Sequence, residues 1–223
     1  DSIDDVRQFL LTNLHYSSEE TRQRHGNYIM RRMFPDGRAD SALRLFAKTY
    51  SGRQELRDVC FYRFVKAEHL MVNVVDDLLL PSIGTGLLVR KHLSEYLRRR
   101  NPNARNIKDC SQAISQAFAA GNIAQVGPTE IRFGYREILL PSYAFVLYSE
   151  FSEPGMYRIS DLENNDAVRA MLWSPDRLLP ASYELRNRRL VAKISEIDNV
   201  RQFTTNLTLD DVVERLSSED SGK

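Results

Sequence analysis

The sequence GLLVRKHLSEYLRRRNPNARNIKDCSQAISQAFAAG, residues 86–121, predicts two helices joined by a short turn. In residues 86–100, apolar side chains recur at helical spacing and the opposite face is basic and polar. The apolar positions are Leu88 or Val89, Leu93, Tyr96 and Leu97. The helix ends at the turn because Pro102 cannot continue it and biases the preceding residue out of helical dihedrals.

The second helix of this stretch begins after Asn106, a residue type that can cap a helix. A narrow apolar stripe recurs at three- and four-residue spacing along it, and Gly121 is typical of a helix C-terminus. The stripe comprises Ile107, Cys110, Ile114, Ala117 and Phe118. The expected exposed face comprises Lys108, Ser111, Gln112, Ser115 and Gln116, side chains that can bond phosphates and base edges.

A two-stranded ribbon follows this helix and turns at Gly127-Pro128. Ile131, Phe133 and Tyr135 alternate with polar residues at a period of two, which is typical of a strand. Arg132 and Arg136 then fall on the opposite face. Helix, turn, helix and ribbon in this order indicate a winged helix over residues 84–140.

The net charge of +1 hides an uneven distribution. Between Arg90 and Lys108 the chain carries seven lysines or arginines against one carboxylate, Glu95. A basic patch in a nearly neutral chain points to a polyanionic partner, although a basic helix face can equally be a solvated face. The candidate DNA-contacting residues are Arg90, Lys91, Arg98, Arg99, Arg100, Arg105, Lys108, Ser111, Gln112, Ser115 and Arg132.

Residues 1–83 are expected to form a helical N-terminal domain. Residues 3–14 show a helical apolar pattern, and a capping box formed by Ser17 and Glu20 opens a second helix that runs to about Met33. A short helix begins at Asp40 or Ser41. Residues 54–80 predict one long central helix, or two helices joined near Glu68-His69. The second helix carries a further basic cluster, which is either a solvated face or a second phosphate-contacting surface: Arg22, Arg24, His25, Arg31 and Arg32.

Residues 141–223 form the third predicted part. Residues 143–148 are apolar on all sides, so they are expected to be buried as a helix or as a strand. Pro175 can open a helix, and residues 190–197 and 201–205 suggest paired strands. This helix-then-ribbon order indicates a second winged-helix-like module, whose exposed edge would carry Arg186, Arg188, Arg189 and Lys193. The whole chain is therefore predicted to be mainly α-helical.

Motifs for catalysis and cofactor binding are missing from the sequence. There is no glycine-rich phosphate loop, no zinc spacing among the histidines and the two cysteines, and no activated nucleophile. Asp76 and Asp77 leave a metal-dependent nuclease open as a third alternative, but no nearby motif supplies a partner ligand. No catalytic residue, metal site or cofactor is therefore predicted.

The compartment is predicted from the cysteines and from the longest apolar run. Cys60 and Cys110 lie among apolar residues of predicted helices, which favours buried reduced thiols in a cytoplasmic protein. The run around residues 78–89 is interrupted by Pro81 and Gly84 and falls far short of the roughly 20 apolar residues that span a bilayer. No membrane association is expected.

Four stretches in this order resemble the BrxA family of bacterial phage-exclusion (BREX) defence systems. They are YIMRR at 28–32, FYRFVKAE at 61–68, residues 106–121 with the ribbon that follows, and LWSP at 172–175. The resemblance implies a double-stranded DNA-binding accessory protein in antiviral defence, with two winged-helix-like parts and other BREX subunits as candidate partners. Family members have also been labelled inner-membrane proteins, which this sequence does not support.

The leading hypothesis from the sequence is a non-enzymatic protein that binds double-stranded DNA mainly through phosphates. Because few base-reading side chains are visible, weak or shape-based specificity is expected. The alternative is a protein–protein adaptor whose basic winged-helix surface docks an acidic partner subunit.

Overall fold

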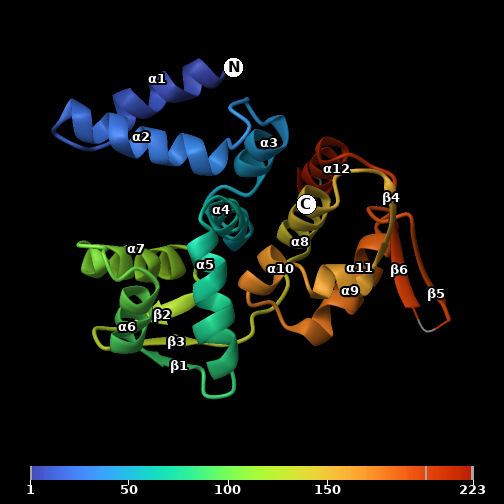
Figure 1. The fold of residues 1–223 in the computed structure, drawn as a ribbon. Coiled ribbons are helices and arrows are strands. Elements are labelled where there is room, and N and C mark those ends of the chain that lie inside the picture. Colours follow the sequence, from blue (N-terminus) through green and yellow to red (C-terminus); the bar gives the residue numbers. More distant parts are fainter. Residues whose placement is uncertain (1, 199, 222–223) are drawn as a thin grey trace.

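The computed structural model describes residues 2–198 and 200–221, which fold into helices and two small three-stranded antiparallel sheets (Figure 1). The predicted mainly α-helical class is confirmed. One continuous cluster of buried apolar side chains extends from Ala42 to Leu216. The three predicted parts of the chain therefore share a core.

The N-terminal helices α1 (Ile3–Asn13) and α2 (Glu19–Met33) form a hairpin at one edge of the molecule (Figure 1). Helix α1 begins with a capping box between Ser2 and Asp5, and it contains no buried residue. The predicted cap of α2 was one residue early, because the Ser18 hydroxyl, rather than that of Ser17, accepts the bond from Thr21 N.

Helices α3 (Ser41–Thr49) and α4 (Gln54–Ala67) lead into the centre of the molecule. Asp40 caps α3 by accepting a bond from Leu43 N at 2.8 Å. The chain breaks its helical path at Glu68 and continues as α5 (His69–Val74), a π-helical turn η1 (Val75–Leu79) and a 3-10 turn η2 (Leu80–Ser82). Of the two alternatives for residues 54–80, the one with a joint near Glu68 is confirmed.

The strands of the first sheet flank a pair of helices in the sequence. The elements in chain order are β1 (Leu87–Val89), α6 (Arg90–Arg100), α7 (Ile107–Ala120), β2 (Ala124–Val126) and β3 (Glu130–Phe133). The strand order is β1-β3-β2, and both pairings are antiparallel. The predicted ribbon is confirmed as β2 and β3, but β3 ends at Phe133, so Tyr135 lies outside the strand predicted to include it.

Residues 87–89 correct the prediction of a helix from Gly86. Leu88 is buried opposite Ile131 of β3, so these residues form an edge strand rather than a first helical turn. Gly86 makes the approach possible, because its φ is +64° and a Cβ there would lie 2.6 Å from the Phe133 carbonyl oxygen. The helix begins only at Arg90.

The C-terminal part also places helices between one strand and a two-stranded hairpin, but with three helices in place of two. Helix α8 (Leu140–Glu150) precedes β4 (Gly155–Arg158), α9 (Ile159–Glu163), α10 (Asp166–Ala170), α11 (Pro175–Asn187), β5 (Lys193–Ile197), β6 (Val200–Thr205) and α12 (Leu209–Ser221). The strand order is β4-β6-β5. The buried segment at 143–148 is helical, and β4 is a strand that the sequence analysis did not predict. The helix predicted from Pro175 is confirmed.

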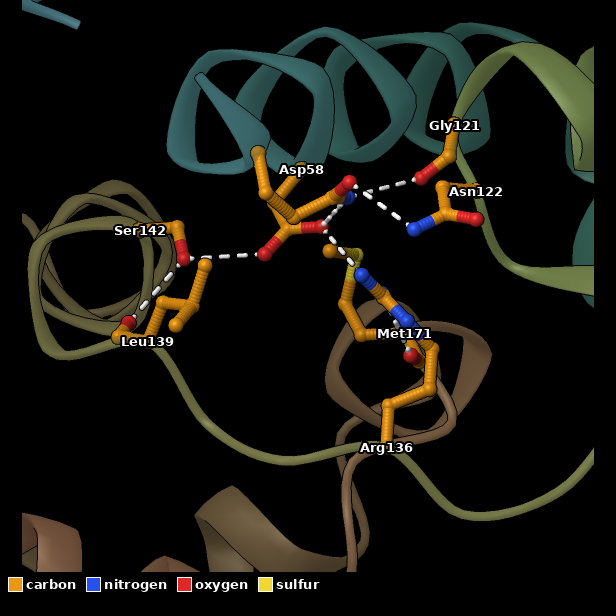
Figure 2. A network of polar contacts seen from close by, with 8 residues as sticks. Asp58, Gly121, Asn122, Arg136, Leu139, Ser142 and Met171 are labelled. Atoms are coloured by element: carbon orange, nitrogen blue, oxygen red, sulfur yellow. Dashed lines mark hydrogen bonds and ion pairs between the residues drawn. The ribbon is translucent and has the colours of Figure 1, made fainter.

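A buried carboxylate fixes the first sheet and its helices to the rest of the molecule (Figure 2). Asp58 of α4 is fully buried and accepts bonds from Arg136 Nη2 at 2.6 Å and from Ser142 Oγ at 3.1 Å. The Arg136 backbone bonds Leu172 O at 2.7 Å. The predicted position of Arg136 on an outward face is therefore wrong, since its guanidinium serves this internal network.

Candidate nucleic-acid interface

Helices α6 and α7 pack through the apolar stripes predicted for them. Leu93, Tyr96 and Leu97 of α6 are buried, and so are Ile107, Ile114 and Phe118 of α7. Their recurrence every three or four residues puts each set on one side of its helix. The packing fixes the basic turn between the two helices at the surface.

Two candidate contact residues, Ser111 and Ser115, are not on the exposed face. Their exposed fractions are 5% and 2%. Ser111 Oγ accepts a bond from Ser94 Oγ of α6 at 3.3 Å, and Ser115 Oγ donates to Ser111 O at 2.8 Å. A hydroxyl that bonds the carbonyl one turn back can be buried without an unsatisfied group. These serines therefore belong to the contact between the helices, and they are corrected as candidate DNA contacts.

A group of exposed cations surrounds the turn between α6 and α7. Its members are Arg98, Arg99, Arg105 and Lys108, hereafter the turn cations. Within residues 2–198 and 200–221, no carboxylate forms an ion pair with any of them. Gln112 of α7 is exposed beside them along the same helix. These five predicted residues are available to a partner.

The other four predicted cations are engaged within the molecule. Arg90 Nη1 donates to Gly127 O at 3.3 Å and to Pro128 O at 3.4 Å, which ties the β2–β3 turn to the start of α6. The remaining three bind carboxylates: Lys91 to Glu95 at 3.7 Å, Arg132 to Glu130 at 2.7 Å and Arg100 to Asp77 at 4.0 Å.

Asp77 helps to position Arg100 at the end of α6. It accepts a bond from the Tyr96 hydroxyl at 2.6 Å, and the Arg100 guanidinium lies 5.4 Å from the centre of the Tyr96 ring. Burial, together with the bond to Asp77, raises the pKa of Tyr96 to about 12. Nothing in the spacing of the sequence had indicated this role for Asp77.

Asp76 and Asp77 have different partners. Asp76 Oδ1 lies 2.9 Å from Arg169 Nη2 of α10, and burial raises the pKa of the Asp76 carboxyl despite this cation. Among the residues that the structure describes, no group of three or more histidine, cysteine or acidic side chains could hold a metal ion. The two carboxylates therefore take part in separate structural contacts.

The first turn of α7 has no side-chain cap. Asn106 occupies the N-cap position as predicted, but in the described structure its side chain accepts no bond from the helix. Its backbone, at φ −110° and ψ 31°, departs from the extended conformation that capping side chains prefer. The amides at the start of this 14-residue helix lie beside Arg105 and Lys108.

The basic cluster of α2 is largely used for internal contacts. Arg22 donates to Tyr16 O at 2.6 Å, and Arg31 and Arg32 both bind Glu68. The Arg32 guanidinium also lies 4.5 Å from the centre of the Phe64 ring. The contacts of Arg31 and Arg32 attach the hairpin to α4 and its C-cap residue, Glu68, which favours a structural role for this cluster.

The second predicted edge, residues 186–193, is partly engaged. Arg186 stacks on Tyr183 at 4.9 Å, and Arg188 pairs with Glu184 at 3.1 Å. Arg189 and Lys193 are exposed. This surface therefore offers fewer unpaired cations than the turn between α6 and α7.

Cys60 and Cys110 are free and half-buried. Over the described ranges, none of the helices combines the length and the apolar character needed to cross a bilayer. Comparisons with protein-family models, with curated proteins and with solved structures found no match.

Proposed function

We propose that this chain is a non-enzymatic protein that binds double-stranded DNA through the turn between α6 and α7. The observation that carries the proposal is the group of turn cations, which are exposed and have no ion-pair partner among the described residues. Duplex DNA presents closely spaced phosphates, and cations that neutralise them release condensed counterions. A solvated helix face does not require four unpaired cations around a single turn.

Residues 87–133 are assigned as a winged helix. The order of β1, α6, α7, β2 and β3, with β1 paired to β3, supports this assignment. In helix-turn-helix proteins the second helix enters the major groove, which makes α7 the groove helix and the β2–β3 hairpin the wing. The bonds from Arg90 to the hairpin turn support a wing held at a fixed angle to the helices.

Binding is expected to depend mainly on phosphates. The turn cations and the uncapped first turn of α7 suit anionic oxygens, because a helix N-terminus carries a partial positive charge. With Ser111 and Ser115 buried, the long polar side chains left on the exposed face of α7 for reading base edges are Gln112 and Gln116. We therefore propose weak sequence specificity.

The biological context that we propose is bacterial defence against phage. It rests on the sequence resemblance to the BrxA family of BREX systems, whose other subunits are then candidate partners. The arrangement of β4, α11, β5 and β6 is compatible with a second winged-helix-like part, as the family implies.

The test is a fluorescence-anisotropy titration of a labelled duplex over a range of salt concentrations. We expect log affinity to fall linearly with log salt, with a slope of about −0.9 for each phosphate contact. The double variant Arg98→Gln, Arg99→Gln should make the slope shallower by about 2. The matched control is Arg38→Gln, Lys48→Gln, which removes the same charge from exposed positions near α3 and should leave the slope unchanged. Absence of binding at low salt, or a slope unaffected by the first variant, would overturn the proposal.

The second candidate function is that of a protein–protein adaptor. It is favoured by the same turn cations, whose exposed charges have no ion-pair partner among the described residues and would equally suit the carboxylates of an acidic partner subunit. An adaptor would retain its partner after nuclease treatment of a native extract. It would also lose that partner in the charge-reversed variant Arg98→Glu, Arg99→Glu, Arg100→Glu. Adding DNA to the extract would not change how much partner is recovered.

A further inference from the structure

A cavity of about 490 Å³ lies between the end of α2, helix α4 and helix α7. Apolar side chains from all three helices line most of it. They are Met33, Leu56, Cys60, Phe61, Phe64, Ala117 and Ala120. Its volume falls within the range of small-molecule sites, which are typically apolar with a few polar groups that fix orientation.

Small residues on α7 produce this cavity. At Gly121 the helix comes so close to α4 that a Cβ would lie 3.0 Å from the Phe61 ring. One turn earlier, the short side chain of Ala117 lines the cavity together with Leu56 and Phe64, which remain half-buried. Apolar surface left partly open to water gains free energy when another apolar group covers it.

Three residues with polar side chains line the cavity, Arg53, Arg57 and Gln116, and each of them is exposed. Arg57 of α4 is exposed there, and it forms no ion pair with any residue that the structure describes. Arg53 is already bound to Glu55 at 2.7 Å and to Asp220 at 2.8 Å. Gln116 of α7 adds a neutral amide to the lining. The wall thus combines an apolar interior with one available guanidinium.

We propose that this cavity is a binding site for an amphipathic carboxylate, with its hydrocarbon body between α4 and α7 and its carboxylate on Arg57. The planar guanidinium matches a carboxylate through two parallel hydrogen bonds. The interior offers the flexible side chain of Met33 and two phenylalanine faces, which suit an alkyl chain. The site uses none of the turn cations, and Gln116 is the one side chain that it shares with the proposed DNA-facing surface among the described residues. Decanoate binding and the salt dependence of duplex binding therefore test the two proposals separately.

The test is isothermal titration calorimetry of the full chain with decanoate below its micelle concentration, alongside the uncharged analogue decanol. We expect saturable one-to-one binding of decanoate. Ala120→Trp places a large ring in the cavity and should weaken binding about tenfold or more, a change of roughly 1.4 kcal/mol. Ala119→Trp is the matched control, because Ala119 is exposed on the same helix and does not line the cavity; it should bind as the parent does.

Arg57→Gln tests the carboxylate contact without touching the interior. Because an exposed ion pair contributes little, decanoate should bind roughly threefold more weakly to this variant while decanol is unaffected. If circular dichroism shows that Ala120→Trp does not fold, Arg57→Gln still tests the site.

Several results would overturn the site. The first is the absence of saturable decanoate binding to the parent chain. The second is an equal loss of decanoate affinity in Ala119→Trp and Ala120→Trp. The third is an equal loss of affinity for decanoate and for decanol in Arg57→Gln. A parent chain that ignores decanoate but forms a dimer that Ala120→Trp dissociates would assign the cavity to a second copy of the chain instead.

Discussion

At the scale of single residues, the pair formed by Asp58 and Arg136 joins segments far apart in the sequence. The Asp58 side chain is 0% exposed, so removing its cation leaves a buried carboxylate that keeps the bonds from Gln54 and Ser142 but has no counter-charge. We expect Arg136→Met to lower the free energy of unfolding by about 3–5 kcal/mol in urea denaturation. Arg132→Met is the control, because the Arg132 side chain is 68% exposed and its loss should cost less than about 1 kcal/mol. Equal losses in the two variants would contradict the central role of Asp58.

Glu150 gives the molecule a dependence of stability on pH. Burial raises the pKa of its carboxyl, but bonds from Tyr62 at 2.5 Å, Asn165 at 2.8 Å and Lys66 at 3.1 Å outweigh burial and leave the pKa below its ordinary value of 4.5. The unfolded chain therefore binds the proton more tightly than the folded chain does.

The stabilising contribution of Glu150 is consequently complete above its ordinary pKa and is lost as pH falls through the lower, folded value. We expect Glu150→Gln to be less stable than the parent at neutral pH and the difference to shrink steadily below pH 4.5. Urea titrations across this range measure it, with Glu137→Gln at an exposed position as the control. A difference that is constant with pH would show that the carboxylate charge is not what stabilises the fold.

At the scale of elements, the sequence predicted the helices and strands that have a long apolar pattern or a residue that marks one of their ends. Helix α7 has five apolar positions at helical spacing, and Pro175 marks the start of α11. Strands β2 and β3 are as short as β1 and β4, but a turn at Gly127-Pro128 joins them in the sequence. Strands β1 and β4 were missed because no such local signal accompanies them. Both pair with strands more than 40 residues away, so their formation depends on tertiary contacts that no local pattern contains.

The exposed face of α7 was predicted only in part, for a similar reason. Whether Ser111 and Ser115 lie inside or outside depends on how closely α6 approaches, and a serine fits either environment. The structure predicts that Ser115→Lys buries an unpaired charge and lowers the free energy of unfolding by more than about 2 kcal/mol. On the exposed side of the same helix, Gln112→Lys should change stability by less than about 0.5 kcal/mol and should tighten duplex binding. Thermal unfolding and the anisotropy titration measure the two effects; equal stability losses would place both residues in the same environment.

At the scale of the whole molecule, the two ends of the chain contribute unequally to the fold. Helix α12 packs against α3 and α8, and it buries Val212, Val213 and Leu216. Polar contacts reinforce this packing, with Thr49 Oγ1 donating to Ser217 Oγ at 2.8 Å and Arg53 pairing with Asp220 at 2.8 Å. In contrast, α1 contacts α2 and contains no buried residue.

Burial of three aliphatic side chains stabilises a fold by about 5–9 kcal/mol, comparable with the total stability of most domains. Deleting residues 208–223 should therefore abolish cooperative unfolding, because it exposes the core faces of α3 and α8. Deleting residues 1–15 removes none of the buried core and should leave a single transition, lowered by only a few degrees. Circular dichroism melts of both truncations measure this difference. A loss of the transition in both would mean that the α1–α2 hairpin, despite its position at the edge, is required for the central core to form.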